Sequence, residues 1–219
     1  MRRMYITSVA IIAALFFACD AAAITGSEII EKVQEHLGKS KTFSAEFEKQ
    51  FYWAALDRSR SRKGEIQMRR PGHFRVELDN GDAVVANGET VWSYVERNKQ
   101  VILSTYEGEL RTPWQVFAGY AEDYVPIAVE EVKLDGRSCY MLALKPANEI
   151  SSKRQMKVWV DKKKWWLLQV ETIEDNEDIV TYVLKGHKVN KKIDDSIFEF
   201  SLPEGAEVVD RRVPVLDDE

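Results

Sequence analysis

Apolar and polar residues alternate along most of this chain, and the alternation predicts β-strands. In residues 64–70, Ile66, Met68 and Arg70 occupy alternate positions, and side chains two apart on a strand point to the same face. After Pro71-Gly72, the same parity continues with Phe74, Val76 and Leu78. An earlier stretch has its own apolar face, made of Phe43, Ala45, Phe47, Phe51 and Trp53. We therefore expect a sheet with a bulky apolar face on which one arginine lies.

Turn signals divide the rest of the chain into further strands. Asn87-Gly88 lies between two β-branched and aromatic runs, which is a strong hairpin signal, and Asp135-Gly136 divides residues 129–134 from 139–144 in the same way. Polar residues at 97–99 and 161–164 separate other strand pairs. Because nearly all the links are short, the sequence predicts an antiparallel meander of ten or eleven strands in a single domain.

Two segments break the strand pattern and predict helices. Thr25 and Glu28 have capping-box spacing, and they precede a helical apolar stripe of Ile29, Ile30, Val33 and Leu37. In residues 111–120, Pro113 suits a first helical position, and Trp114 and Phe117 follow at i, i+3 spacing. A short apolar helix with few charges must cover an apolar surface, so we expect the second helix to act as a lid.

Arg70 is the least expected residue on the apolar face. A guanidinium cannot lose its water without hydrogen-bond partners, because an unpaired charge in an apolar setting is very unfavourable. For any single apolar residue here, an ordinary filled core is an equally good explanation. Arg70 favours a hollow instead, because filled cores seldom contain arginine. We expect Arg70 to latch a lid over a cavity lined by Phe43, Phe47, Ile66, Met68, Phe74, Val76, Leu78, Trp92, Trp114 and Phe117.

The N-terminus has the layout of a cleavable secretory signal peptide. Arg2 and Arg3 precede an apolar stretch over residues 6–18, and small residues follow at 21–23. We expect residues 1–23 to be removed and 24–219 to form one domain in the periplasm. Cys19 leaves open an alternative, in which it becomes the lipidated first residue of an anchored protein. Cleavage after residue 23 leaves Cys139 alone, and we expect it to be a packed structural thiol.

Charge narrows the range of partners. The 219 residues include 31 Lys and Arg against 36 Asp and Glu, a net charge of −5. An acidic chain argues against nucleic acid, whose phosphates are bound by lysine and arginine, and against standing adhesion to anionic membranes. The basic cluster of Arg58, Arg60, Arg62 and Lys63 is expected on an exposed hairpin, with a docking patch for an acidic partner as the alternative.

No pattern of catalytic chemistry is present. His36, His73 and His187 are scattered without metal-ligand spacing, no serine has a nucleophile-elbow context, and no glycine-rich phosphate loop follows a strand. The carboxylates of residues 171–178 lack the alternation and the glycine of a calcium loop, so we expect a solvated hairpin tip there. We therefore predict a protein that is not an enzyme, with no catalytic residues, no metal and no cofactor.

The ordered segments of this chain resemble the periplasmic outer-membrane lipoprotein carrier family, LolA. The matching segments, in chain order, are residues 43–50, Gly64, 70–75, 86–94, 105–120, 140–146 and 198–205. No single segment is decisive, but their order and spacing make the resemblance fairly specific. The Gly72-His73 link after the Arg-Pro pair departs from the family pattern, as does the richness in charge elsewhere.

The resemblance implies a mainly β fold: a half-open antiparallel β-barrel of about eleven strands, covered by a lid of short helices. It implies that the cavity holds the acyl chains of a lipoprotein on its way from the inner to the outer membrane. Arg70 aligns with the arginine that holds the family's lid shut, and Phe74 with a cavity-facing aromatic. The implied partners are acylated lipoproteins, an inner-membrane ATP-binding-cassette release complex and an outer-membrane receptor lipoprotein, with the carrier expected to be a monomer. Relatives of the same fold, an anchored receptor and a lipid-sensing regulator, remain alternatives.

Overall fold

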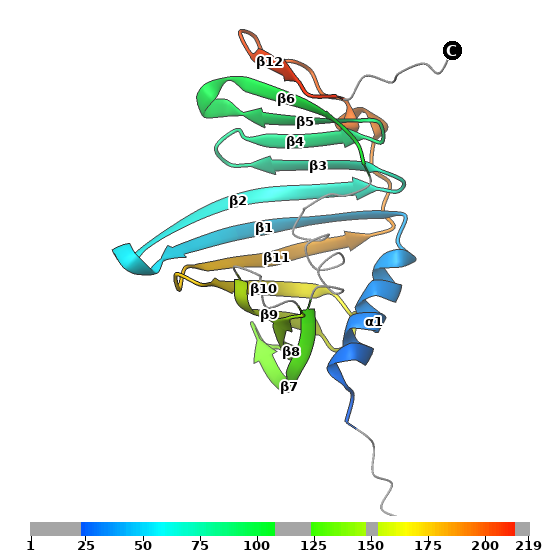
Figure 1. Ribbon diagram of the computed structural model, residues 1–219. Helices are drawn as coiled ribbons and strands as arrows, with labels where there is room; N and C mark the ends of the chain where they lie inside the picture. Colours follow the sequence, from blue (N-terminus) through cyan, green and yellow to red (C-terminus); the bar gives the residue numbers. More distant parts are fainter. Residues whose placement is uncertain (1–22, 108–123, 148–152, 213–219) are drawn as a thin grey trace, which may run out of the picture.

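The computed structural model describes residues 23–107, 124–147 and 153–212, which form one large curved sheet and one α-helix (Figure 1). The strand order in the twelve-stranded sheet is β12-β6-β5-β4-β3-β2-β1-β11-β10-β9-β8-β7. The strands are β1 (Thr42–Trp53), β2 (Arg58–Arg69), β3 (His73–Leu78), β4 (Ala83–Asn87), β5 (Thr90–Val95), β6 (Gln100–Thr105), β7 (Tyr124–Leu134), β8 (Arg137–Pro146), β9 (Lys153–Asp161), β10 (Leu167–Glu174), β11 (Ile179–Val189) and β12 (Glu207–Asp210).

The sheet consists of two meanders that meet at its middle. Strands β1 to β6 pair in sequence, as do β7 to β11, and β1 pairs with β11 to join the two halves. The pairing of β1 with β11 shifts register between Ser44 and Glu46, where the β11 residues Gly186 and His187 lie opposite the single residue Ala45. Gly186 has a φ of +63°, a conformation that glycine adopts without steric penalty. This bulge bends the sheet at its centre.

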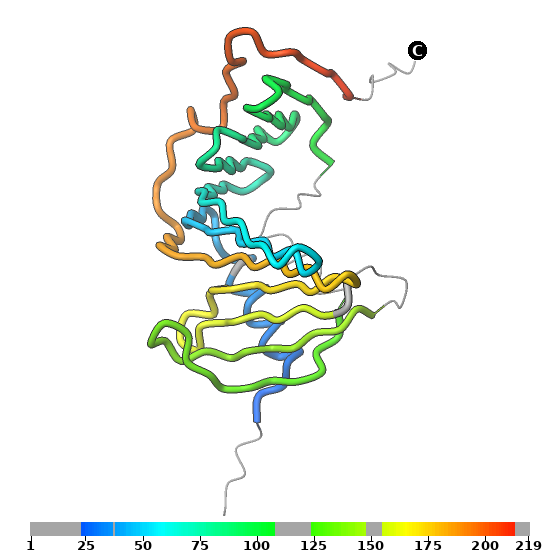
Figure 2. The backbone as a smooth tube through the Cα atoms, turned by 90° about the vertical axis from the view of Figure 1, so that its left-hand side faces the viewer, coloured from blue at the N-terminus to red at the C-terminus, as the bar shows by residue number. Residues whose placement is uncertain are grey.

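The expectation of a mainly β fold is confirmed, but the sheet is open rather than closed. Its two edge strands, β7 and β12, are not paired with each other. The twelfth strand also corrects the all-antiparallel expectation, because β12 pairs with β6 in parallel. The parallel direction follows from the chain's route, since residues 190–206 cross one side of the sheet before β12 joins the edge (Figure 2). The predicted lid helix over residues 111–120 lies outside the described residues.

The helix α1 (Gly26–Gly38) defines the inner face of the sheet, which is the face that it packs against. Its predicted capping box is confirmed: Glu28 N donates to Thr25 Oγ1 (3.2 Å), and Thr25 N donates to Glu28 Oε2 (2.7 Å). Ile29, Ile30 and Val33 are buried in the same apolar cluster as the β1 residues Phe43, Ala45 and Phe47. In both views α1 lies beside the β7–β10 half of the sheet (Figures 1 and 2).

The segment after β11 packs on the opposite, outer face. Its short 3₁₀-helix η3 (Asp195–Phe198) contacts β3 and β4, and Phe198 is buried there. Asp195 pairs with Arg69 at 2.9 Å, and the Arg69 guanidinium lies 5.3 Å from the centre of the Phe198 ring. The outer face of β3 and β4 is therefore covered by the protein's own C-terminal segment.

Local details agree with several of the sequence-based predictions. Asp135 and Gly136 both have positive φ in the β7–β8 turn, as a two-residue hairpin of this kind requires. Cys139 is a buried free thiol, and burial raises its pKa. Two further 3₁₀ turns connect hairpin strands: η1 (Ala54–Leu56) joins β1 to β2, and η2 (Glu96–Asn98) joins β5 to β6. Within the described ranges, no helix is long and apolar enough to cross a membrane.

Candidate functional site

The inner face of β1, β2 and β3 carries most of the predicted lining in three cross-strand rows. Antiparallel register sets side chains of the same face directly opposite one another. The first row is Phe43, Met68 and Phe74, the second is Ala45, Ile66 and Val76, and the third is Phe47, Gly64 and Leu78. The apolar faces that the sequence predicts for separate segments therefore adjoin and form one continuous surface.

This surface grades from fully buried to half-exposed side chains. Phe43, Phe47, Ile66 and Phe74 are each at most 5% exposed. The neighbouring residues with partial exposure are Met68, Val76 and Leu78. The buried residues pack in two clusters, one that includes α1 and one formed by Phe74, Ala86 and Val91, and Met68 and Val76 pack against both. Half-exposed apolar side chains between two buried clusters are suited to contact an apolar ligand.

Gly64 shapes the third row. A Cβ atom at this position would lie 2.5 Å from Cζ of Phe47 and 2.4 Å from the backbone oxygen of Glu77. Contacts this short essentially never occur, so the Phe47 ring occupies the space that a side chain at residue 64 would need. The absence of a side chain at residue 64 thus lets Phe47 lie flat against β2 and extend the inner face.

Trp92 is not part of this surface, which corrects the sequence-based expectation. Val91 lies opposite Ala86, and Trp92 lies opposite Val85, so Trp92 has the outer-face parity. Its ring stacks on Phe200 of the C-terminal segment with 6.1 Å between ring centres. The physical reason is that β5 is apolar on both faces, since its outer face packs under the C-terminal segment.

Arg70 lies one residue beyond the end of β2, in the turn to β3, and it is exposed. Its backbone N–H donates to the carbonyl oxygen of Lys41 (2.9 Å). Among the described residues its guanidinium has no hydrogen bond or ion pair, in contrast to the Arg69 guanidinium, which pairs with Asp195 on the outer face. Trp114, Phe117 and the rest of the predicted lid lie outside the described residues, so the latch remains a prediction.

The inner face of the other half of the sheet completes the apolar surface, and the sequence-based reasoning did not assign these residues to it. They come from β8, β9 and β11 and include Leu142, Leu144, Met156, Val158 and Leu184. Part of the signal was present, because Leu142 and Leu144 occupy alternate positions in the run Tyr140–Lys145. What the sequence could not supply was the pairing of β1 with β11, which joins the two halves.

A buried histidine lies at the edge of this surface. His187 Nε2 donates to the carbonyl oxygen of Leu167 (2.7 Å), and its ring stacks on Trp166 with 4.9 Å between ring centres. Its Nδ1 atom is buried without a hydrogen-bond partner among the described residues. Burial lowers the pKa of His187, because a protonated ring would bring a second N–H into an apolar site. His187 is therefore a packed residue of the core, held by its hydrogen bond to Leu167 and its stacking on Trp166.

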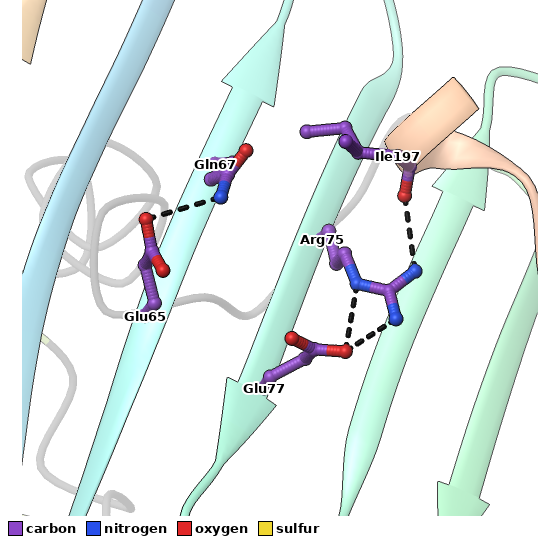
Figure 3. A network of polar contacts seen from close by, with 5 residues as sticks. All are labelled: Glu65, Gln67, Arg75, Glu77 and Ile197. Atoms are coloured by element: carbon purple, nitrogen blue, oxygen red, sulfur yellow. Dashed lines mark hydrogen bonds and ion pairs between the residues drawn. The ribbon is translucent and has the colours of Figure 1, made fainter. Parts of the chain in front are cut away.

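The outer face is polar by comparison. Arg75 donates to the carbonyl oxygen of Ile197 (3.0 Å) and to the Glu77 carboxylate, and Gln67 donates to Glu65 (3.0 Å), as Figure 3 shows. A hollow of about 460 Å³ lies near Gly64. Its charged lining residues are Glu46, Glu48, Lys63, Glu77, Asp79 and Lys185. Phe47, Leu78 and Val183 also line it, so charged and apolar side chains are mixed around this hollow.

The structure also places the predicted hairpin tips. Arg58, Arg60 and Lys63 are exposed, as predicted for the basic cluster, and Arg62 is partly exposed. Of the carboxylates of residues 171–178, Asp175, Glu177 and Asp178 lie in the β10–β11 turn, whereas Glu171 and Glu174 belong to β10, and Asp178 is buried rather than solvated. Its Oδ1 atom accepts a hydrogen bond from the backbone N–H of Ala54 (2.9 Å), which ties this turn to the tip of the β1–β2 hairpin. Within the described ranges, no group of three or more His, Cys, Asp or Glu side chains could hold a metal ion.

An open, strongly curved sheet of twelve strands with an apolar inner face, against which one helix packs, defines the class of fold. A protein of Thermus thermophilus described as an uncharacterized conserved protein has the same fold, with a TM-score of 0.58 at 16% identity, over 84% of this chain and 98% of that one. Residues 38–201 match the family described as outer membrane lipoprotein carrier protein LolA, and the chain belongs to that family.

Relatives from several bacteria support the assignment. The outer-membrane lipoprotein carrier protein of Histophilus somni (strain 129Pt) is 27% identical over 192 residues, which cover 86% of this chain and 91% of the relative. The protein of the same name from Glaesserella parasuis serovar 5 (strain SH0165) is 24% identical over 200 residues, which cover 90% and 92% of the two chains. The similarity therefore extends along nearly the whole length of both relatives.

Proposed function

We propose that this protein is a periplasmic carrier that shields the acyl chains of lipoproteins on its inner face. The observation that carries the proposal is the set of three cross-strand rows on β1–β3, in which half-exposed Met68, Val76 and Leu78 adjoin buried aromatic rings. Membership of the lipoprotein carrier family supplies the class of ligand. The hollow near Gly64 has charged residues around Phe47, Leu78 and Val183, so it offers no continuous apolar surface.

The energetics of acyl chains explain why such a carrier is needed. Burial of one CH₂ group is worth about 0.8 kcal/mol, so a single 16-carbon chain gains on the order of 12 kcal/mol by leaving water. An acyl chain that crossed water without protection would meet a free-energy barrier of that size. A continuous apolar surface removes the barrier, provided that the chain moves directly from one apolar environment to the next.

In the proposed cycle, Arg70 holds a lid over the empty inner face. The supporting observations are its exposed position in the β2–β3 turn and the absence of a partner for its guanidinium among the described residues. Hydrogen bonds from a guanidinium to carbonyl oxygens of the proposed lid would be charge-assisted and therefore stronger than neutral ones. Bound acyl chains displace the lid and break these bonds, so loading and release need no nucleotide bound to the carrier.

We place the working protein in the periplasm, with residues 1–23 as its cleaved signal peptide and 24–219 as one monomeric carrier domain. An inner-membrane ATP-binding-cassette complex loads it with acylated lipoprotein, and an outer-membrane receptor lipoprotein unloads it. Mass spectrometry of the mature N-terminus tests the first step: Ile24 as the first residue fits a soluble carrier, whereas diacylated Cys19 indicates an anchored receptor.

The site itself is tested by introducing the same charge on either face. Val76 on the inner face and Val183 on the outer face are both half-buried valines in strands. Val76→Asp puts a carboxylate among the proposed acyl contacts, so we expect binding of a fluorescent fatty-acyl probe to weaken at least tenfold. Val183→Asp is the matched control and should leave the affinity unchanged. Equal affinities for both variants would place the probe somewhere other than the inner face.

The latch has a separate test. Arg70→Leu is expected to accept lipoprotein from donor membranes but to release it poorly, because the empty, closed state loses its stabilising hydrogen bonds. Arg97→Leu, at an exposed arginine in η2, serves as the control. The assay measures transfer of radiolabelled lipoprotein from the carrier to acceptor membranes that contain the receptor. Transfer by Arg70→Leu at the rate of the unsubstituted protein would refute the latch.

A further inference from the structure

The β1–β2 hairpin projects beyond its neighbours at one end of the sheet (Figure 1). Pairing of β2 with β3 begins only at Gly64 with Leu78, so residues 58–63 of β2 have no strand on that side. Pairing of β1 with β11 ends at Tyr52 with Ile179. The tip of the hairpin is therefore accessible from several directions.

Cations gather on one face of this projection. The side chains of Arg58, Arg60 and Arg62 occupy alternate positions, so they share a face and follow one another at a spacing of about 7 Å. The residues opposite them on β1 are Trp53, Phe51 and Lys49. Lys49 and Arg62 are thus like charges placed directly across from each other, a pairing that destabilises a sheet. An anionic partner would offset that repulsion.

These charges are only weakly neutralised by the protein. Among the described residues, the guanidinium groups of Arg58 and Arg60 have no ion pair or hydrogen bond with another side chain, and Arg62 lies 4.0 Å from Asp79. Asp57, the acidic residue of the tip, accepts a hydrogen bond from the Tyr52 hydroxyl (3.1 Å). The cationic face is therefore free to meet an external anion.

The end of the hairpin is apolar. The turn η1 has the sequence Ala54-Ala55-Leu56, and Leu56 is 64% exposed. The half-buried rings of Phe51 and Trp53 lie just behind it, 4.5 Å apart between centres. The turn has a fixed shape, because Asp57 N donates to the Ala54 carbonyl oxygen (3.3 Å) and Ala54 N donates to the buried Asp178 carboxylate. An exposed aliphatic residue is thus held in place at the extremity, with Trp53 and Arg58 level with each other behind it and the other arginines farther back.

We propose that the tip of the β1–β2 hairpin docks reversibly on the anionic phospholipid surface of a membrane. The order of residues along the hairpin matches the layers of a bilayer surface: Leu56 at the extremity for the hydrocarbon, Trp53 with Arg58 for the interface, and Arg60 and Arg62 behind them for the phosphates. An acidic protein segment could neutralise the arginines, but it would leave Leu56 exposed at the extremity, so the lipid surface is the better fit.

The acidic remainder of the chain limits the docking and orients it. With a net charge of −5, the molecule as a whole is repelled by an anionic surface, and only the basic hairpin is attracted. The contact is therefore transient and sensitive to salt. The docking inference rests on the proposed carrier function in one respect only: a carrier must reach a membrane, and docking of the hairpin would bring it there.

The test measures how much of the full-length mature protein sediments with vesicles. Vesicles of phosphatidylethanolamine and phosphatidylglycerol should bind the protein at low salt, and phosphatidylcholine vesicles should not. Each arginine near an anionic surface contributes about fivefold in affinity, so replacement of Arg58, Arg60 and Arg62 by Gln should weaken binding about 100-fold. The matched control replaces the exposed lysines Lys163, Lys188 and Lys191 by Gln, which removes the same charge elsewhere. It should lose less than fivefold.

Four single substitutions test the orientation of the hairpin. Leu56→Ser should weaken vesicle binding although the net charge is unchanged. Tryptophan fluorescence should be quenched by brominated phosphatidylglycerol, and Trp53→Phe should abolish that quenching. Since Arg62 is farthest from the tip and nearest to Asp79, Arg62→Gln should have a smaller effect than Arg58→Gln.

Several results would overturn the docking proposal. One is an equal loss of vesicle binding in the two triple variants, and another is unchanged vesicle binding by Leu56→Ser. A third is binding to polyglutamate without binding to anionic vesicles, which would indicate an acidic protein partner instead. A fatty-acyl probe in solution separates this outcome from failure of the carrier function. The triple arginine variant should bind that probe normally, whereas loss of probe binding in the unsubstituted protein would count against the carrier and not against the hairpin.

Discussion

Replacement of Gly64 by alanine should disturb both the stability of the sheet and the proposed ligand surface. The added Cβ would lie 2.5 Å from Cζ of Phe47 and 2.4 Å from the backbone oxygen of Glu77. The Phe47 ring can move only by leaving its place on the inner face. The Glu77 oxygen belongs to the neighbouring strand β3, so it can move only if β2 and β3 separate slightly.

The magnitude follows from these two contacts. Insertion of a methyl group into a well-packed site usually lowers the free energy of unfolding by about 1–3 kcal/mol. Because one of the two clashes involves backbone, we expect the upper end, about 3 kcal/mol. For a domain of this size, a loss of about 1 kcal/mol lowers the melting temperature by about 2–4 °C, so the shift should be about 6–12 °C.

Thermal unfolding followed by circular dichroism measures the shift. Gly38→Ala is the matched control, because a Cβ at Gly38 would have no heavy atom within 4 Å and the residue does not have a positive φ. Phe47→Ala combined with Gly64→Ala provides a second check. Removal of the Phe47 ring relieves one of the two clashes, so the double variant should be less destabilised than the sum of the single variants.

The probe assay adds a functional readout of the same substitution. A displaced Phe47 ring should weaken binding of the fatty-acyl probe to Gly64→Ala, but not to Gly38→Ala. If Gly64→Ala melts within about 1 °C of the unsubstituted protein, the packing of Phe47 against β2 is wrong, and so is the third row of the proposed surface.

Three other substitutions test separate parts of the account. Phe198→Ala removes a ring that is 1% exposed beneath Arg69, and it should lower the free energy of unfolding by about 3–5 kcal/mol in urea titrations. Asp161→Ala should lower it by about 1–2 kcal/mol, because the buried carboxylate accepts hydrogen bonds from the backbone N–H groups of Lys163 (2.8 Å) and Lys164 (2.9 Å). His187 has a lowered pKa in the folded state, so the unfolded chain binds its proton more readily, and stability should be full above about pH 6.5 and fall as the pH drops below it. His187→Phe should flatten that dependence, and an equally steep loss in both proteins would assign it to other groups.

Much of the sheet could be predicted because its inner face is strictly alternating. Phe43, Ala45 and Phe47 in β1, and Phe74 and Val76 in β3, were predicted to share a face with Ile66 and Met68, and the register places them in adjoining rows. Alternation is informative wherever one face is apolar and the other polar. On β1–β3 that condition is met, since the outer face carries Glu65, Gln67, Arg75 and Glu77.

The prediction for Trp92 was wrong where that condition is not met. Val91 lies on the inner face, and Trp92 and Tyr94 pack on the outer face beneath Phe200, so β5 is apolar on both sides. Its sequence therefore does not show which side is inner. The covering segment itself was not predicted, because Phe198 and Phe200 become buried only through contacts with residues far away in the chain.

Asp178 shows a second limit of sequence-based prediction, because here a polar residue is buried where a solvated turn was expected. Within a run of carboxylates it resembles any residue of a solvated turn, yet it is 8% exposed and binds the backbone of Ala54, 124 residues away. The pairing of β1 with β11 brings these two hairpin ends together. Local patterns identify the turns, but the long-range pairing decides which turns meet.

The central claim is that acyl chains lie on the inner face, and photo-crosslinking tests it most directly. A fatty acid or lipoprotein with a diazirine in its acyl chain would be bound to the mature protein, irradiated and mapped by peptide mass spectrometry. The account predicts labels on the β2 and β3 segment that contains Met68, Phe74 and Val76. Labels confined to the outer hollow around Val183, or the absence of saturable labelling, would contradict it.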